Sequence, residues 1–252
     1  MIVRFLLFLL LLSSLNARSA NDTPGWHLYP SYGRYLCRMR PEKKKQIFFR
    51  TSSEEKIVAL TFDDGPLRRT PALLQLLKKR NIPATFFLLA PQISEAKARL
   101  YDDPLFEVGL HSYHHYDYRK LSPRRVRWEL DHALRIFHRH GLHPRYFRPP
   151  YGMVSTALLR ELTKRDLHTI LWSIDSQDWN RYRGQRLIDN ILPSLVPGSV
   201  ILLHDQATSL KDITALIDAI LQSAYRIVPL KRLIEKGGVL PCAISLHPVQ
   251  NI

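Results

Sequence analysis

Cysteine is almost absent from this sequence: its 252 residues contain only Cys37 and Cys242, one near each end. Two cysteines permit at most one disulfide, so the fold cannot depend on a disulfide framework. In an exported chain the pair is compatible with one bridge between the segment before the first predicted strand and the C-terminal tail. The sequence leaves open whether the two thiols are bridged, because it does not place their Cα atoms within bonding range.

Glycine is also scarce, with ten residues against seventeen prolines, which indicates sharp loop starts and little flexible linker. Neither a linker nor an internal repeat interrupts residues 56–236, and we therefore predict a single domain there. An N-terminal arm over residues 20–55 precedes it, and a tail over residues 237–252 follows it. A hydrophobic fraction of 45% is sufficient for a substantial core.

Acidic residues are few: 22 Asp and Glu stand against 37 Lys and Arg, which gives a net charge of +15. Such a charge suits nucleic acid, an anionic membrane surface or an acidic polymer. The basic residues are scattered, and the sequence has no zinc-finger, RRM or basic-heptad motif. We therefore expect no nucleic-acid partner and a cationic surface that fits an anionic cell envelope. A nucleic-acid binder, the competing hypothesis, would show steep salt dependence.

Long apolar runs are missing except near the N-terminus, where Arg4 precedes the run Phe5 to Leu12 and a stretch of small polar residues follows. This pattern predicts a signal peptide over residues 1–19, and an uncleaved anchor is the alternative. We expect a secreted, periplasmic or envelope protein, monomeric and without a transmembrane span once the signal is cleaved.

From Lys56 onward, short apolar runs alternate with segments of helical period. The predicted strands are 56–62, 84–90, 105–112, 145–149, 168–174, 199–204 and 226–230. The predicted helices are 70–80, 92–101, 122–140, 155–165, 185–195 and 212–223. This alternation predicts an α/β fold, a distorted (β/α) barrel with seven parallel strands and helices outside.

Polar residues follow the ends of five of these predicted strands. They are Asp63 and Asp64, His111, Arg148, the segment Asp175 to Trp179, and His204. In a β/α barrel the carboxyl ends of the strands share one rim, where active sites form. Two adjacent carboxylates at the end of a buried strand require a partner, since desolvation of a carboxylate is costly.

Two histidines four residues apart, His111 and His115, could supply that partner. If the segment after the strand makes a helical turn, both imidazoles share one face and can bind one ion, while His114 points elsewhere. Two imidazoles and one carboxylate leave coordination positions open, as a catalytic zinc site requires. The second carboxylate is then free to accept a proton from water.

Five motifs occur in order along the chain. They are Thr61-Phe62-Asp63-Asp64-Gly65-Pro66, His111-Ser112-x-x-His115, Arg148-Pro149-Pro150-Tyr151-Gly152, Asp175-Ser176-x-Asp178-Trp179 and Leu202-Leu203-His204-Asp205. Together they resemble the motifs of NodB-type polysaccharide deacetylases, carbohydrate esterase family 4, over about residues 56–236. The resemblance implies a NodB homology domain and hydrolysis of N-acetyl groups.

The first two motifs and Arg148 imply the base and metal side of the site. By resemblance, Asp64, His111 and His115 bind a divalent metal ion, with Zn²⁺ expected and Co²⁺ or Ni²⁺ as alternatives. Asp63 is the general base, and Arg148 holds its carboxylate.

The later motifs imply the acid and substrate side. By resemblance, His204 protonates the leaving amine and Asp178 supports its charge. The backbone N–H of Tyr151 stabilises the oxyanion. Tyr151, Trp179 and Leu202 contact the sugar and its acetyl group.

Two positions depart from the family pattern: Tyr116 stands where proline is common, and Leu110 stands where a polar residue is frequent. Neither change removes a reacting group, but both put the substrate contacts in doubt. The expected substrate is peptidoglycan or a poly-N-acetylglucosamine glycan, with chitin-like oligomers and O-acetylated xylan left open. The alternative is an inactive barrel that binds glycan or envelope polymers.

Overall fold

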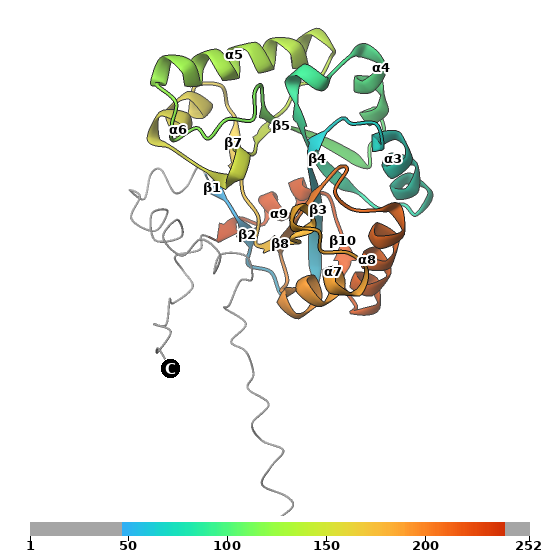
Figure 1. The fold of residues 1–252 in the computed structure, drawn as a ribbon. Coiled ribbons are helices and arrows are strands. Elements are labelled where there is room, and N and C mark those ends of the chain that lie inside the picture. The colour runs from blue at the N-terminus through green and yellow to red at the C-terminus, as the bar shows by residue number, and fades with distance from the viewer. Residues whose placement is uncertain (1–46, 240–252) are drawn as a thin grey trace, which may run out of the picture.

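The computed structural model describes residues 47–239, in which helices surround a central sheet (Figure 1). The predicted signal peptide, Cys37 and Cys242 lie outside the described residues. The strands are β1 (Ile47–Phe48), β2 (Arg50–Thr51), β3 (Ile57–Gly65), β4 (Ala84–Leu89), β5 (Phe106–Ser112), β6 (Tyr146–Phe147), β7 (His168–Ile170), β8 (Ile174–Asp175), β9 (Ser199–His204), β10 (Arg226–Ile227) and β11 (Gly238–Val239). The α-helices are α3 (Thr70–Lys79), α4 (Glu95–Ala98), α5 (Pro123–Arg139), α6 (Thr156–Thr163), α7 (Gly184–Ile191), α8 (Leu210–Gln222) and α9 (Leu230–Glu235).

The main sheet is parallel throughout, in the order β1-β7-β6-β5-β4-β3-β9-β8, with β10 against the start of β3. One stretch of chain supplies both β7, which pairs with β1 and β6, and β8, which pairs with β9 at the far edge. Between them, the N–H of Leu171 donates to Phe48 and the N–H of Ser173 donates to Val200. The sheet therefore curls into the distorted (β/α) barrel that the sequence predicts.

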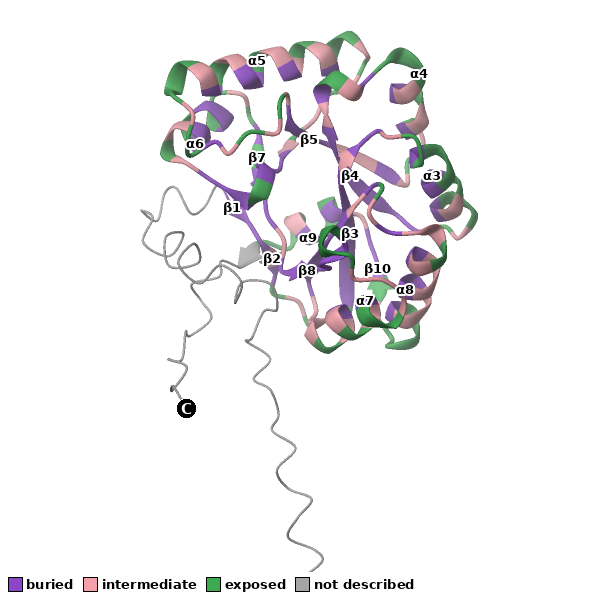
Figure 2. Cartoon of the chain, viewed as in Figure 1, coloured by how far each residue is buried: buried purple, intermediate pink, exposed green. Residues whose placement is uncertain are grey.

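β3 is central because its residues 57–62 are all buried, and it pairs with β4, β9 and β10. Figure 2 shows β3 and β4 largely buried between the surrounding helices. A strand that is covered on both faces reads as a continuous apolar run, which explains why the sequence identifies it. The same apolar run carries Asp63 and Asp64 to the rim of the barrel.

The long helix α5 begins where the sequence chemistry predicts. Ser122 caps α5 by accepting a hydrogen bond from the N–H of Arg125, and Pro123 occupies the first helical position. Four positions at helical spacing face inward along α5: Val126, Leu130, Ala133 and Phe137. Among the described residues, 47–239, no helix has the length and apolarity needed to cross a membrane.

The structure differs from the predicted elements in several places. The predicted helix 92–101 contains only the four residues of α4 as α-helix, flanked by 3₁₀ turns at Ala90–Gln92 and Arg99–Tyr101. β1 and β2 lie within the segment assigned to the arm, and the predicted strand 168–174 divides into β7 and β8. The sheet consequently has more than the seven strands expected. α9 follows β10 where the prediction continued the strand to residue 230. These are short elements of two to six residues, and the strands β1 and β2 pair with partners that are distant in the sequence.

Candidate active site

The five polar clusters meet at the carboxyl ends of the strands, as the sequence predicts. Asp63 lies near the end of β3, His111 near the end of β5, and His204 ends β9. Arg148 follows β6, and Asp175 ends β8. Asp63 and His204 are register partners on adjacent strands, so their backbones lie about 4.8 Å apart.

The backbone at this rim adopts the left-handed conformation at five residues that are not glycine. They are Asp64 (φ 72°), His115 (φ 58°), Tyr151 (φ 60°), Gln177 (φ 59°) and Arg181 (φ 60°). Each such residue costs of the order of 1 kcal/mol and persists only where the surrounding structure imposes it. Strain of this kind concentrates at functional sites, and here it lies in the loops that carry the polar clusters.

Asp64, His111 and His115 converge on one point. Asp64 Oδ1 lies 3.5 Å from His111 Nε2 and 3.5 Å from His115 Nε2, and the three atoms lie within 4.8 Å of one another. Asp64 Oδ1 is buried and has no hydrogen-bond partner among the described residues. A buried carboxylate oxygen without a donor requires a positive charge nearby.

The state of His111 strengthens this inference. Its Nδ1 lies 2.9 Å from the carbonyl oxygen of Arg148, which can only accept, so Nδ1 carries the proton and Nε2 presents a lone pair. Burial lowers the pKa of His111 to about 3, so the ring is neutral at neutral pH. Two imidazoles and a carboxylate in this geometry fit a divalent cation of the zinc class.

The predicted helical turn between the two histidines is wrong. His111 still belongs to β5, and the chain reaches His115 through a loop in which Ser112 Oγ accepts the N–H of His115 at 2.9 Å. The left-handed backbone of His115 then turns its ring toward His111, with centroids 5.0 Å apart. His115 Nδ1 lies 3.2 Å from Tyr151 Oη, which connects two of the motifs.

Asp63 and Arg148 form a buried ion pair beside these three residues. Arg148 Nη1 donates to Asp63 Oδ1 at 2.8 Å and also to Thr61 Oγ1 at 2.8 Å. Arg148 Nε donates to the carbonyl of Ile170, and Nη2 donates to the carbonyl of Leu171. All three guanidinium nitrogens are therefore hydrogen-bonded, and the side chain is fixed. Burial raises the pKa of Asp63, and Arg148 opposes that rise only in part. Asp63 Oδ2 lies 3.9 Å from His111 Nε2.

His204 and Asp178 form a second pair across the rim. His204 Nδ1 lies 2.7 Å from Asp178 Oδ1, while Asp178 Oδ2 accepts the N–H of His204 at 2.8 Å and the hydroxyl of Thr208 at 2.9 Å. Burial alone would lower the pKa of His204, but the hydrogen bond and charge of Asp178 outweigh it and raise the pKa to about 9. His204 is therefore a cationic acid at neutral pH.

Comparison with known proteins decides the family. The polysaccharide deacetylase family model matches residues 50–170. A chitooligosaccharide deacetylase of Bradyrhizobium is 32% identical over 192 residues, 71% of this chain and 87% of that protein. The chain belongs to the polysaccharide deacetylase family. The peptidoglycan-N-acetylglucosamine deacetylase of Bacillus cereus is 36% identical over 152 residues, 58% of this chain and 55% of that protein.

Solved structures of polysaccharide deacetylases share the fold. The Bc1960 peptidoglycan N-acetylglucosamine deacetylase matches with a TM-score of 0.68 at 29% identity, over 78% of this chain and 96% of that one. A CE4-family pseudoenzyme from Bacillus anthracis matches with a TM-score of 0.69 at 25% identity, over 77% and 70% of the two chains. The chain spans 55% of the Bacillus cereus relative and 32% of a bifunctional xylanase/deacetylase of Pseudobutyrivibrio xylanivorans.

The predicted sugar contacts differ in exposure. Tyr151 and Trp179 are 59% and 49% exposed, and Trp179 Nε1 donates to Asp175 Oδ1 at 3.2 Å. Leu202 is buried in β9, between Thr61 of β3 and Asp175 of β8. The two aromatic residues therefore present surface to solvent at the rim, whereas Leu202 lies within the barrel wall.

Three residues that support the site were given no role from the sequence, although Thr61 and Asp205 stand within the motifs. Thr61 accepts a hydrogen bond from Arg148, and Asp205 accepts from Thr70 and from the N–H of Leu67, which holds the loop after Asp64. Glu129 is buried on α5 and holds His114. A polar residue within an apolar run, such as Thr61, is the one signal that the sequence offers. The partners of Asp205 and Glu129 are visible only in the fold.

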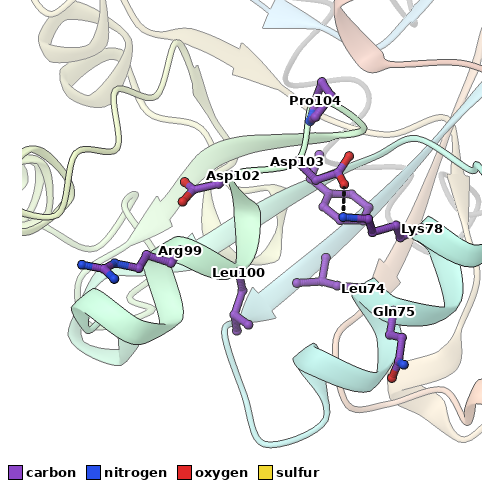
Figure 3. Close-up of a pocket in the computed structure, with 9 residues that line it drawn as sticks. Leu74, Gln75, Lys78, Arg99, Leu100, Asp102, Asp103 and Pro104 are labelled. Carbon is purple, nitrogen blue, oxygen red and sulfur yellow. Dashed lines mark ion pairs between the residues drawn. The ribbon is translucent and has the colours of Figure 1, made fainter.

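A hollow lies elsewhere, between α3 and the segment that leads into β5 (Figure 3). Its volume is about 320 Å³, and Phe106, five residues before His111 on β5, is one of the residues that line it. Lys78 and Asp103 form an ion pair at 2.8 Å across it, with Lys78 largely exposed. The hollow contains none of the predicted site residues, because it lies toward the amino end of the strands.

Proposed function

We propose that this chain is a metal-dependent hydrolase that removes N-acetyl groups from the amino sugars of a polysaccharide. The convergence of Asp64, His111 and His115 between the Asp63–Arg148 pair and the His204–Asp178 pair carries the proposal. A cation alone could serve a binding protein. A cation site with a buried base and a protonated acid beside it fits hydrolysis of an amide.

Asp64, His111 and His115 would hold the cation. A bound divalent ion of the zinc class, or Co²⁺ or Ni²⁺, supplies Lewis acidity for water and the acetyl carbonyl. Asp63 removes the proton from the attacking water, and Arg148 fixes the Asp63 oxygen that does not face the site. The raised pKa of Asp63 makes it a better proton acceptor than an exposed carboxylate.

The departing nitrogen needs a proton, because an amide expels its amine poorly. His204 donates this proton, and Asp178 keeps the ring charged and oriented. The backbone N–H of Tyr151 stabilises the oxygen anion that forms as water adds to the carbonyl. Tyr151, Trp179 and Leu202 shape the space for the sugar and its acetyl group.

The substrate we propose is an N-acetylated envelope glycan, peptidoglycan or a poly-N-acetylglucosamine chain. The net charge of +15 supports an anionic envelope as the setting, and two relatives are named for peptidoglycan N-acetylglucosamine and chitooligosaccharides. We also propose export to the envelope as a monomer. Cell fractionation and size-exclusion chromatography of the exported protein test these two points.

Amine release is the direct test of the proposal. Purified protein is stripped with a chelator, supplied singly with Zn²⁺, Co²⁺ or Ni²⁺, and incubated with peptidoglycan or N-acetylglucosamine oligomers. We expect free amine and acetate in equal amounts, only after metal is restored. Asp63→Asn is the matched control, since it keeps the metal ligands and removes the base.

A non-catalytic glycan-binding barrel is the second candidate, because a pseudoenzyme shares this fold. A mutant of that protein has restored enzymatic activity, so the same fold is compatible with both states. Binding of glycan without release of amine under any metal would favour this candidate. The presence of Asp63, Arg148 and His204 in paired geometry favours the enzyme.

A further inference from the structure

Tyr116 is an exposed aromatic side chain directly after the candidate metal ligand His115. The large apolar side chains exposed within residues 47–239 are Tyr116 at 43%, Tyr151 at 59%, Trp179 at 49% and Leu221 at 41%. The three aromatic residues all lie in rim loops that carry site residues, whereas Leu221 lies on α8. Exposed aromatics gathered around a polar site indicate a ligand surface.

Other tyrosines of the same loop differ from Tyr116. Tyr118, two residues later, is fully buried, and Tyr113 is half-buried against Trp128 at a centroid distance of 5.3 Å. Tyr113 therefore packs the loop against α5, and Tyr118 packs against Phe147 of β6 at a centroid distance of 5.6 Å. Tyr116 is the ring that the loop leaves at the surface.

A buried carboxylate supports this part of the loop. Glu129 of α5 has no exposed surface, yet its Oε1 lies 2.7 Å from His114 Nδ1 and its Oε2 accepts the N–H of His114 at 3.1 Å. Arg125 Nη2 lies 3.1 Å from Glu129 Oε1. Burial of a carboxylate is costly unless its oxygens are hydrogen-bonded. Glu129 therefore fixes both the backbone and the ring of His114. None of the proposed catalytic steps uses Glu129.

The ring of His114, fixed in this way, carries Tyr116. The two rings stack at a centroid distance of 5.2 Å and an interplanar angle of 18°. The guanidinium carbon of Arg125 lies 5.7 Å from the Tyr116 ring and 4.2 Å from that of Trp128. Tyr116 is thus held from one side and still has 43% of its surface exposed.

We propose that Tyr116 is a stacking subsite for a sugar of the glycan chain next to the one that is deacetylated. A β-linked N-acetylhexosamine has a face of axial C–H groups, whose slightly positive hydrogens suit the electron-rich face of an aromatic ring. Tyr116 directly follows His115 in the same rim loop, and its exposed ring therefore lies within a few ångströms of chain from a candidate cation ligand. This inference rests on the proposed function and deepens it to recognition of a polymer.

The test compares N-acetylglucosamine oligomers of two and six units, bound in chelator so that turnover stops, by calorimetry. Wild type gains affinity with chain length, and Tyr116→Ala reduces that gain about 3- to 10-fold. Tyr116→Phe keeps the ring face and retains the gain. Leu221→Ala, which removes an exposed apolar side chain on α8, also leaves the gain unchanged.

Three results would overturn the subsite: no binding of the hexamer by wild type, equal loss for dimer and hexamer in Tyr116→Ala, or no loss for either. Kinetics with metal restored separate the two proposals, since the KM for the hexamer rises in Tyr116→Ala. If wild type binds the hexamer but releases no amine, the deacetylase proposal fails and the binding series still decides the role of Tyr116.

Discussion

The two ends of the barrel both contain charged residues, but they use them differently. In the hollow of Figure 3, Lys78 and Asp103 pair at the surface, and solvent screens them. At the carboxyl rim, Asp63, Arg148 and Asp178 are at most 3% exposed. Arg148 and Asp178 make several hydrogen bonds each, and Asp63 is held by Arg148. Buried, hydrogen-bonded polar groups therefore distinguish the candidate site from this hollow.

Among the substitutions that test this difference between the two ends of the barrel, Asp63→Asn is expected to have the largest effect on activity. This variant keeps the shape and the bond from Arg148 but cannot accept a proton, so kcat falls about 10²- to 10⁴-fold. The rate of amine release measures the loss, and elemental analysis verifies that the metal content is unchanged. Near-normal amine release would remove Asp63 from the role of base.

Arg148→Met tests the burial of charge at the rim. Removal of one partner leaves Asp63 buried without its cation, which costs about 3–5 kcal/mol of unfolding free energy. Denaturant unfolding measures the cost. Arg226→Met, which breaks an exposed pair with Glu55 at the opposite end, is the matched control and should have little effect. Equal losses in the two variants would contradict the distinction between the two ends.

Asp178→Asn tests the acid. His204 has a pKa of about 9 in the folded chain, above its ordinary value near 6.5, so its proton and the activity are lost as pH rises through about 9. Without the carboxylate, burial lowers the pKa of His204, and the alkaline limb of kcat moves to lower pH.

The same shift makes stability depend on pH. The His204–Asp178 pair contributes fully below about pH 6.5, and its contribution is lost between pH 6.5 and about 9. Wild type should therefore lose this stability over that range, and Asp178→Asn should not. Unfolding at several pH values measures it, and identical profiles for the two proteins would refute the pairing.

The smallest effect is expected at the other end of the barrel. Lys78→Ala breaks the ion pair in the hollow without touching a site residue, so kcat and KM should equal those of wild type. Amine release on the hexamer measures both values. A substantial loss of activity would show that the hollow takes part in function.

The sequence predicts those parts of the fold that bury continuous apolar runs. β3, β4, β5 and β9 are covered on both faces and are found within three residues of their ends. β1 and β2 are two-residue strands within a basic segment, and their partners lie more than 100 residues away, so local pattern cannot reveal them. The division of 168–174 into β7 and β8 likewise depends on neighbouring strands, because β7 pairs with β6 and β8 pairs with β9.

The candidate site, like the fold, could be predicted only in part from the sequence. The motifs identify the residues that converge, but not how the chain brings them together: a helical turn was expected at His115, whereas Ser112 and a left-handed backbone place it. Arg148 reaches Thr61 across 87 positions of sequence, and Glu129 reaches His114 from another element. Such pairings are properties of the folded chain.

The metal content of the protein tests the central claim most directly. Elemental analysis after loading with Zn²⁺ and removal of excess ion should give one ion per chain for wild type and for Asp63→Asn, and a large loss for His111→Ala. Unchanged zinc in His111→Ala, with the fold intact by circular dichroism, would contradict the claim that Asp64, His111 and His115 hold the cation.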